Sequence, residues 1–374
     1  MREYLLVLLV AAAATYVFAG LWRHQAVRTG VMAPIRERDV HVTPTPYHGG
    51  LAMLFGVGSA FVLAAGLPFL GKHAIVTRDS FAILAAAAVI TAVGAIDDAI
   101  DLPWVAKVAG QVLAAGVAVL NGVRMYWISL PNQLIALDTA TSILVTVVYI
   151  FVCVNAINLI DGLDGLAAGV VGIGATAMFL YTYSLAYLQN FVVATTASLV
   201  TVTVAGVCLG FLPHNFHPAR QFMGDSGAML LGLLLACSTL SFTGQIDASA
   251  LRPQHGGLMP SWLPLILPVA AMALPLADLG LAYVRRTWRG DWWFVADKRH
   301  LHHRLLQAGH SQGSAVFVMY LWTAVISFGA IALGLLPLPW RVLAPVLGAV
   351  LATVVTLRPL RGRVRGSSAR GGIG

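Results

Sequence analysis

Charged residues are scarce in this sequence. Asp, Glu, Lys and Arg make up 10% of the 374 residues, whereas hydrophobic residues make up 59%. A soluble domain carries about 25% charged residues, and the mean hydropathy of this chain is +0.82. The composition therefore excludes a soluble protein and indicates an integral membrane protein.

Cysteine is also scarce. Cys153, Cys208 and Cys237 lie in apolar runs, and their odd number and irregular spacing fit neither a disulfide framework nor a metal site. We expect them to be small core residues. No internal repeat is evident, and only the Arg-, Gly- and Ser-rich stretch 361–374 has the composition of a disordered segment.

Long apolar runs predict an all-α polytopic bundle of about 10–11 transmembrane helices. Backbone groups in lipid must bond internally, and these runs lack the alternation of barrel strands, so the spans are helices. The predicted spans are 4–22, 49–70, 80–96, 104–121, 140–157, 165–184, 190–212, 227–243, 262–284, 315–335 and 339–357. A signal peptide is the weaker interpretation of the first span, because more hydrophobic spans follow and no clear small-x-small cleavage site precedes Trp22.

The distribution of basic residues predicts the orientation. With the N-terminus outside, 17 of the 23 Lys and Arg residues fall on the inner side and six on the outer side. This bias follows the positive-inside rule and places the C-terminus in the cytoplasm. The formal net charge of +8 then reflects topology and anionic headgroups, and it requires no nucleic-acid partner.

We expect one transmembrane catalytic domain over residues 1–360 and a disordered basic cytoplasmic tail over 361–374. The localisation follows as a multi-pass protein of the cell membrane with its active site on the cytoplasmic face. The predicted cytoplasmic loops that form this site are 23–48, 97–107, 155–165, 213–226 and 285–314.

Six of the 15 acidic residues lie in three short motifs on the predicted inner side. These are Asp97-Asp98-x-x-Asp101, Asn155-x-x-Asn158-x-x-Asp161-Gly-x-Asp164-Gly165 and Gly224-Asp225-Ser226-Gly227. Carboxylates near the apolar core are unfavourable, by about 2.5–3.5 kcal/mol for an Asp at a helix centre. Converging carboxylates also repel one another, and a divalent cation offsets that repulsion. Hard oxygen ligands suit Mg²⁺ or Mn²⁺.

Each acidic motif also has a purely structural interpretation. Asp-Gly pairs such as those at Asp161 and Asp164 are ordinary helix-end residues. Asp225 before Ser-Gly can simply cap a helix, and Asp97-Asp98 can form a solvated interfacial face. All three structural interpretations would have to hold together on one side of the membrane.

The last predicted inner loop is basic. It contains Arg285-Arg286, Arg289, Lys298-Arg299-His300, His302-His303 and Arg304. Arginine forks bind phosphate and histidines add donors, so this loop is a candidate anion clamp. Zinc lacks a supporting ligand set, and the positive-inside rule alone explains the arginines but not three histidines within four residues.

Asp278 lies inside the ninth predicted span. An intramembrane acid is a functional candidate by default. Pairing with Arg285 or Arg286, about two turns later, is the equal alternative.

In order along the chain, these motifs resemble the polyprenyl-phosphate N-acetylhexosamine-1-phosphate transferases. The resemblance covers about residues 35 to 310 and begins with His41-Val-Thr-Pro-Thr-Pro and His48-Gly-Gly, where Tyr47-His48 departs from many members and leaves its role open. It continues through the three acidic motifs to His300-x-His302-His303.

The resemblance implies transfer of GlcNAc-1-phosphate from UDP-GlcNAc to undecaprenyl or decaprenyl phosphate, with release of UMP and a requirement for Mg²⁺. It implies that Asp225 and Asn158 contact the metal, and that Asp97 and Asp98 lie where the lipid phosphate meets the pyrophosphate. We expect Asp161 and Asp164 to be catalytic as well. The expected substrate-binding residues are Lys107, Asn155, Arg299, His300, His302, His303 and Arg304. This reaction would be the first membrane step of a cell-surface polysaccharide pathway.

Two other functions are alternatives to GlcNAc-1-phosphate transfer. A UDP-MurNAc-pentapeptide or other UDP-HexNAc transferase is the nearer one, but the MurNAc branch usually has three consecutive histidines followed by Phe-Glu, which this chain lacks. A secondary transporter would place polar groups near mid-membrane with repeat symmetry, whereas these acids stand at one face. A homodimer is left open by the sequence.

Overall fold

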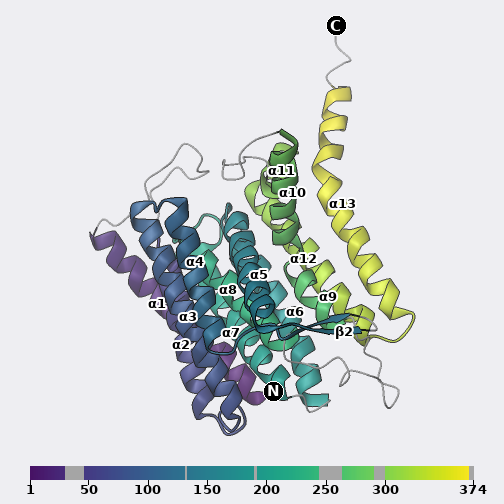
Figure 1. Ribbon diagram of the computed structural model, residues 1–374. Helices are drawn as coiled ribbons and strands as arrows, with labels where there is room; N and C mark the ends of the chain where they lie inside the picture. The colour runs from purple at the N-terminus through teal and green to yellow at the C-terminus, as the bar shows by residue number, and fades with distance from the viewer. Residues whose placement is uncertain (30–45, 131–132, 189–191, 244–262, 290–299, 370–374) are drawn as a thin grey trace.

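The computed structural model describes residues 1–29, 46–130, 133–188, 192–243, 263–289 and 300–369. Most of the chain is helical, and the long helices lie roughly side by side in one bundle (Figure 1). The helices are α1 (Arg2–Thr29), α2 (Gly49–Gly66), α3 (Ala74–Ile100), α4 (Trp104–Leu120), α5 (Thr139–Ile160), α6 (Leu166–Leu188), α7 (Val192–Asn215), α8 (Gly224–Thr243), α9 (Leu263–Ala271), α10 (Ala273–Arg289), α11 (Leu301–Gln307), α12 (Gln312–Leu335) and α13 (Trp340–Ala369).

The all-α polytopic fold predicted from hydropathy is confirmed. Within the described residues, nine helices are long and apolar enough to cross a membrane, and the 17-residue α4 is a shorter apolar helix. Ten predicted spans each fall on one helix, whereas the ninth is divided between α9 and α10 at Met272. Pro275 lies in the first turn of α10, where a proline is tolerated, and this favours a new helix start over a continuous helix.

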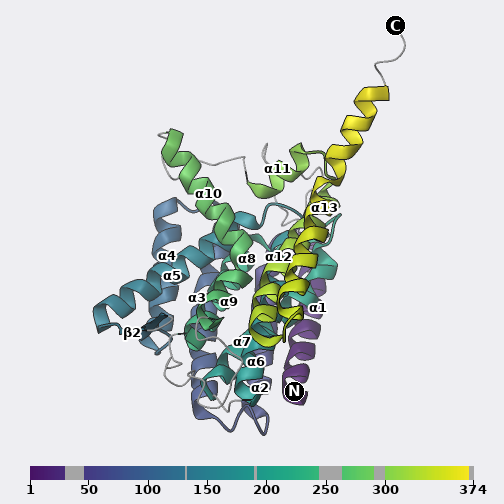
Figure 2. The ribbon, with the colours of Figure 1, turned by 90° about the vertical axis from the view of Figure 1, so that its right-hand side faces the viewer.

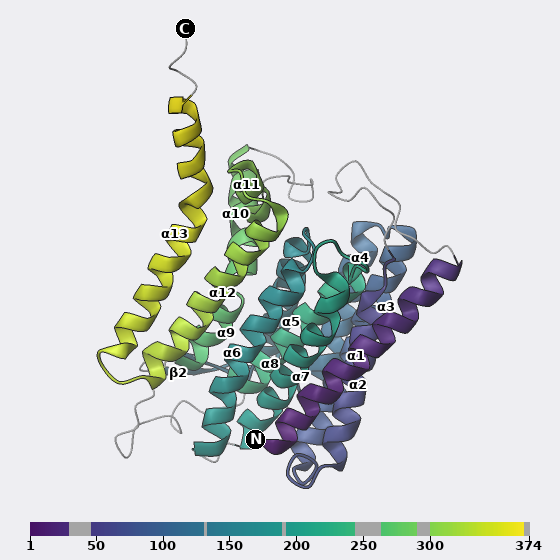
Figure 3. The ribbon, with the colours of Figure 1, turned by 180° about the vertical axis from the view of Figure 1, so that it is seen from behind.

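Helix α1 begins and helix α13 ends at opposite ends of the bundle (Figure 1). A short antiparallel hairpin of β1 (Trp127–Leu130) and β2 (Gln133–Ala136) lies toward the end where α1 starts, and α11 lies toward the other end (Figures 1 and 3). The start of α1 and the end of α13 at opposite ends of the bundle fit an odd number of membrane-spanning helices. The predicted sidedness, with the N-terminus outside, stays a prediction.

The core of the bundle is built around α8. The membrane-spanning window of α8 is 94% buried, against 6% for α13, which lies at the right-hand edge in Figure 1 and faces the viewer in Figure 2. Helix α8 packs against α2, α3, α5 and α7, whereas α13 packs mainly on α12. The first residues of α8 are therefore surrounded by the helices that carry the other motifs.

The C-terminal residues differ from the sequence-based expectation. A disordered tail was predicted over 361–374, but α13 continues to Ala369. Each residue added to an existing helix gains one backbone hydrogen bond, so extension from a long membrane helix is easier than starting a new one. Residues 370–374 lie outside the described residues.

Candidate active site

The first turn of α8 forms the centre of the candidate site. Gly224 begins the helix with a φ of 68°, a left-handed conformation that residues with a side chain rarely adopt. Asp225 follows, so its carboxylate stands at the N-terminus of the most buried spanning helix. The positive end of the helix dipole favours a carboxylate at this position.

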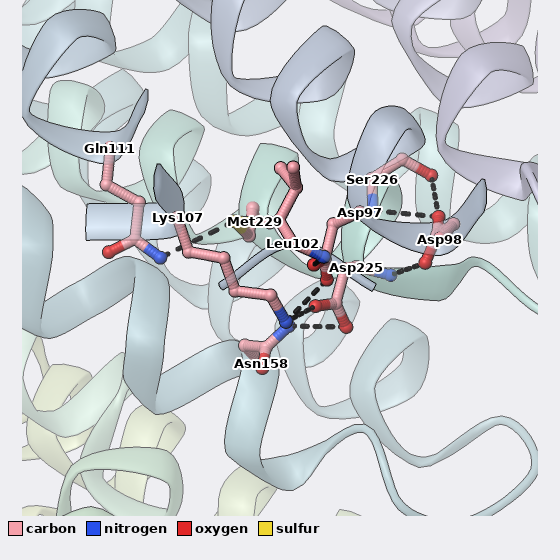
Figure 4. A network of polar contacts seen from close by, with 9 residues as sticks. All are labelled: Asp97, Asp98, Leu102, Lys107, Gln111, Asn158, Asp225, Ser226 and Met229. Atoms are coloured by element: carbon pink, nitrogen blue, oxygen red, sulfur yellow. Dashed lines mark hydrogen bonds and ion pairs between the residues drawn. The ribbon is translucent and has the colours of Figure 1, made fainter. Parts of the chain in front are cut away.

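Asp98 holds the start of α8 in place. Its carboxylate accepts hydrogen bonds from the backbone N–H of Asp225 at 2.8 Å, the backbone N–H of Ser226 at 3.2 Å and the Ser226 hydroxyl at 2.9 Å (Figure 4). The first N–H groups of a helix lack partners within the helix. Asp98 therefore caps α8 from the neighbouring helix α3.

The backbone before α2 also docks on the start of α8. The N–H of Gly49 donates to the carbonyl of Phe222 at 3.0 Å, and the N–H of Gly50 donates to the carbonyl of Met223 at 3.1 Å. A Cβ on Gly50 would collide with the backbone nitrogen of Gly227. Gly49 and Gly50 thus permit the backbone before α2 to approach the start of α8 closely, which helps to place Asp225.

Lys107 joins the first and third acidic motifs. Its ammonium lies 2.5 Å from Asp97 Oδ2 and 3.0 Å from Asp225 Oδ2 (Figure 4). The other Asp97 oxygen accepts the backbone N–H of Leu102 at 2.9 Å, just beyond the end of α3. One lysine therefore offsets part of the charge of two carboxylates from different helices.

The two asparagines of the second motif have different partners. Asn158 donates from its side-chain amide to Asp225 Oδ1 at 3.0 Å. Asn155, one turn earlier on α5, donates to Gln111 Oε1 at 2.7 Å. The amide nitrogen of Gln111 in turn lies 3.5 Å from the sulfur of Met229 (Figure 4). Asn158 belongs to the carboxylate network, and Asn155 joins a second polar layer beside it.

The pKa of Asp161 depends on the charges and the burial of the site. The pKa of the Asp161 carboxyl is raised to about 8, mainly by burial and in addition by the nearby carboxylates of Asp225, Asp98 and Asp164. Burial and nearby negative charge both favour the protonated form of a carboxyl group. The part of the shift that comes from the three carboxylates is the part that a bound cation would offset.

Asp164 contacts the loop between α7 and α8. Its Oδ2 atom lies 2.8 Å from Nδ1 of His217 and accepts the backbone N–H of Ala219 at 3.1 Å. The Asp164 side chain is almost fully buried, whereas that of His217 is half exposed. These contacts support a role in holding the loop, and a catalytic role of Asp164 stays a prediction.

The three histidines cluster at α11. The ring centroids of His302 and His303 are 4.3 Å apart, and those of His300 and His302 are 5.7 Å apart with nearly parallel rings. The pKa of His302 is lowered to about 4, mainly by burial and in part by His303 and His300. His302 is therefore neutral at pH 7, and it contributes hydrogen bonding to the predicted anion clamp but no positive charge.

His302 connects this cluster with the second acidic motif. A Cβ built on Gly162 would lie 2.6 Å from Nε2 of His302. Such a distance is too short for a side-chain carbon, so the glycine after Asp161 leaves the space that the His302 ring needs. The Asp161-Gly162 pair, directly after α5, thus forms part of the packing against α11.

The described part of the chain brings most of the predicted site residues together. Asp97, Asp98, Lys107, Asn158 and Asp225 form one network, and Asp161 lies within its electrostatic reach. Arg304 is exposed on α11, and Arg299 lies outside the described residues. The individual chemical roles assigned from the sequence stay predictions.

Three residues of the site were missed by the sequence analysis. Ser226 was quoted in a motif without a role, and Gln111 and His217 were not singled out. Gln111 could have been found, because it follows Lys107 by four residues and is a buried polar residue in an apolar helix. His217 carries no comparable signal, since its link to Asp164 depends on the fold.

The oxygen donors of the site suit a hard divalent cation. Among the described residues, no three His, Cys, Asp or Glu side chains form a ready metal site. Mg²⁺, however, is commonly held by one or two carboxylates together with substrate phosphates. Asp225 supplies a carboxylate, and Asn158 uses its amide nitrogen toward Asp225, so its amide oxygen is the atom suited to a cation. The donor set fits Mg²⁺ once a phosphate-bearing substrate is bound.

Comparison with known proteins gives the family. The profile described as glycosyl transferase family 4 matches residues 80–243. A decaprenyl-phosphate N-acetylglucosaminephosphotransferase of Mycobacterium tuberculosis is 45% identical over 367 residues, which cover 96% of this chain and 90% of the relative. The chain belongs to glycosyl transferase family 4. This confirms the resemblance drawn from the motifs and removes the transporter interpretation.

Two other relatives are named for transfer of different sugar phosphates. An undecaprenyl-phosphate alpha-N-acetylglucosaminyl 1-phosphate transferase of Yersinia pestis is 27% identical over 311 residues, which cover 82% of this chain and 77% of the relative. A phospho-N-acetylmuramoyl-pentapeptide-transferase of Mycobacterium bovis is 31% identical over 287 residues, with coverage of 67% and 79%. The high-coverage match at 45% identity is to an N-acetylglucosamine enzyme.

Proposed function

We propose that this chain transfers GlcNAc-1-phosphate from UDP-GlcNAc to a polyprenyl phosphate. The products are polyprenyl-diphospho-GlcNAc and UMP. The observation that carries the proposal is the network in which Lys107 joins Asp97 and Asp225 while Asn158 contacts the same Asp225. Acids, an amide and one lysine at the end of a membrane bundle suit a reaction between two phosphate-bearing substrates, one of them a lipid.

Magnesium is the proposed cofactor, with Mn²⁺ as a substitute. Asp225 and Asn158 would hold it together with the diphosphate of the donor. When bound, the ion neutralises charge that develops on the diphosphate and favours the departure of UMP. Besides burial, the negative charges of Asp225, Asp98 and Asp164 contribute to the raised pKa of Asp161, and a cation would offset those charges.

The proposed reaction is a direct in-line transfer. The acceptor is a phosphate monoester whose second pKa is about 6, so at neutral pH it is mostly a dianion. One of its oxygens forms a bond to the sugar-linked phosphorus of the donor, the bond from that phosphorus to the bridging oxygen breaks, and UMP leaves. A strong general base is not needed, and Asp97 with Lys107 orients the acceptor phosphate.

The alternative reaction is a covalent phospho-aspartate route. Asp98 is poorly suited to be its nucleophile, because both of its oxygens already accept hydrogen bonds from the start of α8. Incubation with UDP-GlcNAc in the absence of lipid acceptor tests this route. A trapped phosphorylated protein would contradict direct attack.

The donor is proposed to bind between the carboxylate network and the histidine cluster. The packing of His302 on Gly162 places α11 beside the end of α5. His300, His303 and Arg304 lie on or next to the same short helix and provide further polar groups for the nucleotide-sugar. We infer from the 17-to-6 basic bias that this end of the bundle faces the cytoplasm, in a cell membrane.

Purified protein in lipid nanodiscs, assayed for UMP release with polyprenyl phosphate and a panel of UDP-sugars, tests the proposed function. We expect UDP-GlcNAc to be used best, and Asp225→Asn provides the inactive control. Preference for UDP-MurNAc-pentapeptide would show that the chain is a MurNAc-pentapeptide transferase. No UMP release with any UDP-sugar would contradict the proposed reaction. Light scattering on the same sample gives the oligomeric state.

A further inference from the structure

Asp278 is a fully buried acid whose role the sequence left undecided. Its Oδ2 atom lies 3.1 Å from Nδ1 of His300, and its Oδ1 atom accepts the backbone N–H of Leu301 at 2.9 Å. Both carboxylate oxygens therefore face the start of the histidine helix α11. The structure thus shows His300 as a partner, where the sequence had suggested Arg285 or Arg286.

These two contacts have different consequences. The bond from Leu301 satisfies an N–H in the first turn of α11, and any acceptor of the right shape would serve. The bond to His300 has a chemical consequence as well. A carboxylate can only accept, so Nδ1 of His300 must carry the hydrogen. The other ring nitrogen, Nε2, then remains as the atom through which His300 can bind another group.

The ring of His300 also contacts the rings of the other two histidines. Its ring lies nearly parallel to that of His302, with an interplanar angle of 11°, and 6.4 Å from that of His303. His302 in turn packs on Gly162, next to Asp161. Asp278 on α10 is therefore linked through α11 to the end of α5, where the carboxylate cluster begins.

We propose that Asp278 is a positioning residue for the donor substrate. By accepting the Nδ1 hydrogen of His300, it fixes the orientation and the tautomer of that ring and presents Nε2 to the nucleoside diphosphate sugar. The inference rests on the proposed function, because it assigns the histidine cluster to the donor. Asp278 itself is buried and does not touch the substrate.

The decisive variant is Asp278→Asn. An asparagine keeps the shape of the side chain but offers one oxygen to two N–H donors, so it either leaves Leu301 without its acceptor or forces Nδ1 of His300 to accept. We expect the KM for UDP-GlcNAc to rise by about tenfold or more, in the range found when a residue that orients a ligand group is replaced. The KM for polyprenyl phosphate should stay within about twofold, because Asp278 acts through His300 on the donor alone.

A second variant ties the effect to His300. His300→Ala should raise the KM for UDP-GlcNAc to a similar extent, and the double variant should be no worse than His300→Ala alone, because both changes remove one function. Multiplied losses in the double variant would overturn the proposal. So would an unchanged KM in His300→Ala, even if Asp278→Asn does not fold.

Asp79→Asn provides the matched control. Asp79 is another buried acid in a membrane helix, and at 1.5 Å per residue it lies about 27 Å along α3 from Asp97. The control should lower the melting temperature without changing either KM. If Asp278→Asn behaves like this control, its role is structural only and the proposal is wrong. Wild-type protein assayed in parallel separates the two hypotheses, since a wild type that releases no UMP contradicts the proposed reaction itself.

Discussion

Asp98 at the end of α3 accepts the backbone N–H of Asp225 at the start of α8, at 2.8 Å. Two acids from separate motifs are thereby joined through one hydrogen bond between a side chain and the backbone. The carboxylate of Asp225 remains available to Lys107 and Asn158. Of these two acids, Asp98 therefore positions the start of α8, and Asp225 is the residue that is positioned.

Asp225→Asn should abolish turnover. The substitution keeps the size of the side chain but removes the charge proposed to hold Mg²⁺, and loss of a metal contribution of several kcal/mol corresponds to about 100-fold or more in rate. The measurement is UMP release as a function of Mg²⁺ concentration, with the melting temperature as a control for folding. Full activity in a folded variant would remove the metal assignment.

Asp98→Asn should give a partial defect. The amide offers one oxygen where three donors are now satisfied, and each bond to a charged group contributes about 1.5–3 kcal/mol. We expect a lower melting temperature and a loss of activity of about tenfold, because Asp225 is displaced but still present. Ser226→Ala removes one donor and should show a smaller change in both measurements.

A different result for Asp98→Asn would contradict its role as a helix cap. An unchanged melting temperature together with complete inactivity would show that Asp98 acts on the substrate. That result would favour the phospho-aspartate route over direct attack.

The helical spans were predictable because hydropathy over about 20 residues is a strong signal. The division between α9 and α10 was missed, since the apolar run continues through Met272 and the break depends on Pro275 and tertiary packing. The cap that Asp98 provides was missed for a related reason. Sequence spacing predicts which residues share a helix face, but it does not predict which backbone groups of another helix they meet.

The site was predictable as a set of residues, but not in its internal organisation. The sequence grouped three histidines as donors in an anion clamp, whereas burial makes His302 neutral. One of the contacts of the buried His302 ring is with Gly162, which is 140 residues away in the chain. The partners of Asp164 and Asp278 likewise depend on loops and helices that meet only in the folded protein.

Gly162→Ala should impair use of the donor. The added methyl group would lie 2.6 Å from Nε2 of His302 and would push α11 away from α5. We expect a higher KM for UDP-GlcNAc, with little change for the lipid. His302→Ala should raise the same KM, and in its background the glycine substitution should add no further loss, because the colliding ring is gone. A further loss in the double variant would show that the contact is not the cause.

The stability of the protein should depend on the protonation of Asp161 between about pH 4 and about pH 8. In the folded state Asp161 keeps its proton to about pH 8, whereas in the unfolded chain it loses it near pH 4. The folded state binds more protons over this window, so the free energy of unfolding falls as the pH rises from about 4 to about 8. Asp161→Asn removes this dependence.

The melting temperature in EDTA checks this expectation. The Asp161→Asn variant should melt above the wild type at pH 8, and the difference should shrink toward pH 4. If the variant melts lower at pH 8, a partner stabilises the charged carboxylate and the electrostatic description of the cluster is wrong.

The central claim is that the motifs meet at one face of the membrane, and side-specific cysteine labelling tests it directly. The natural cysteines Cys153, Cys208 and Cys237 are buried, so single cysteines can be introduced at the exposed positions Asp101, Arg220, Arg304 and Lys72. With an impermeant maleimide, the first three should react only in inside-out vesicles and Lys72→Cys only in right-side-out vesicles. Labelling of positions 101, 220 and 304 from opposite sides would mean that no common site exists.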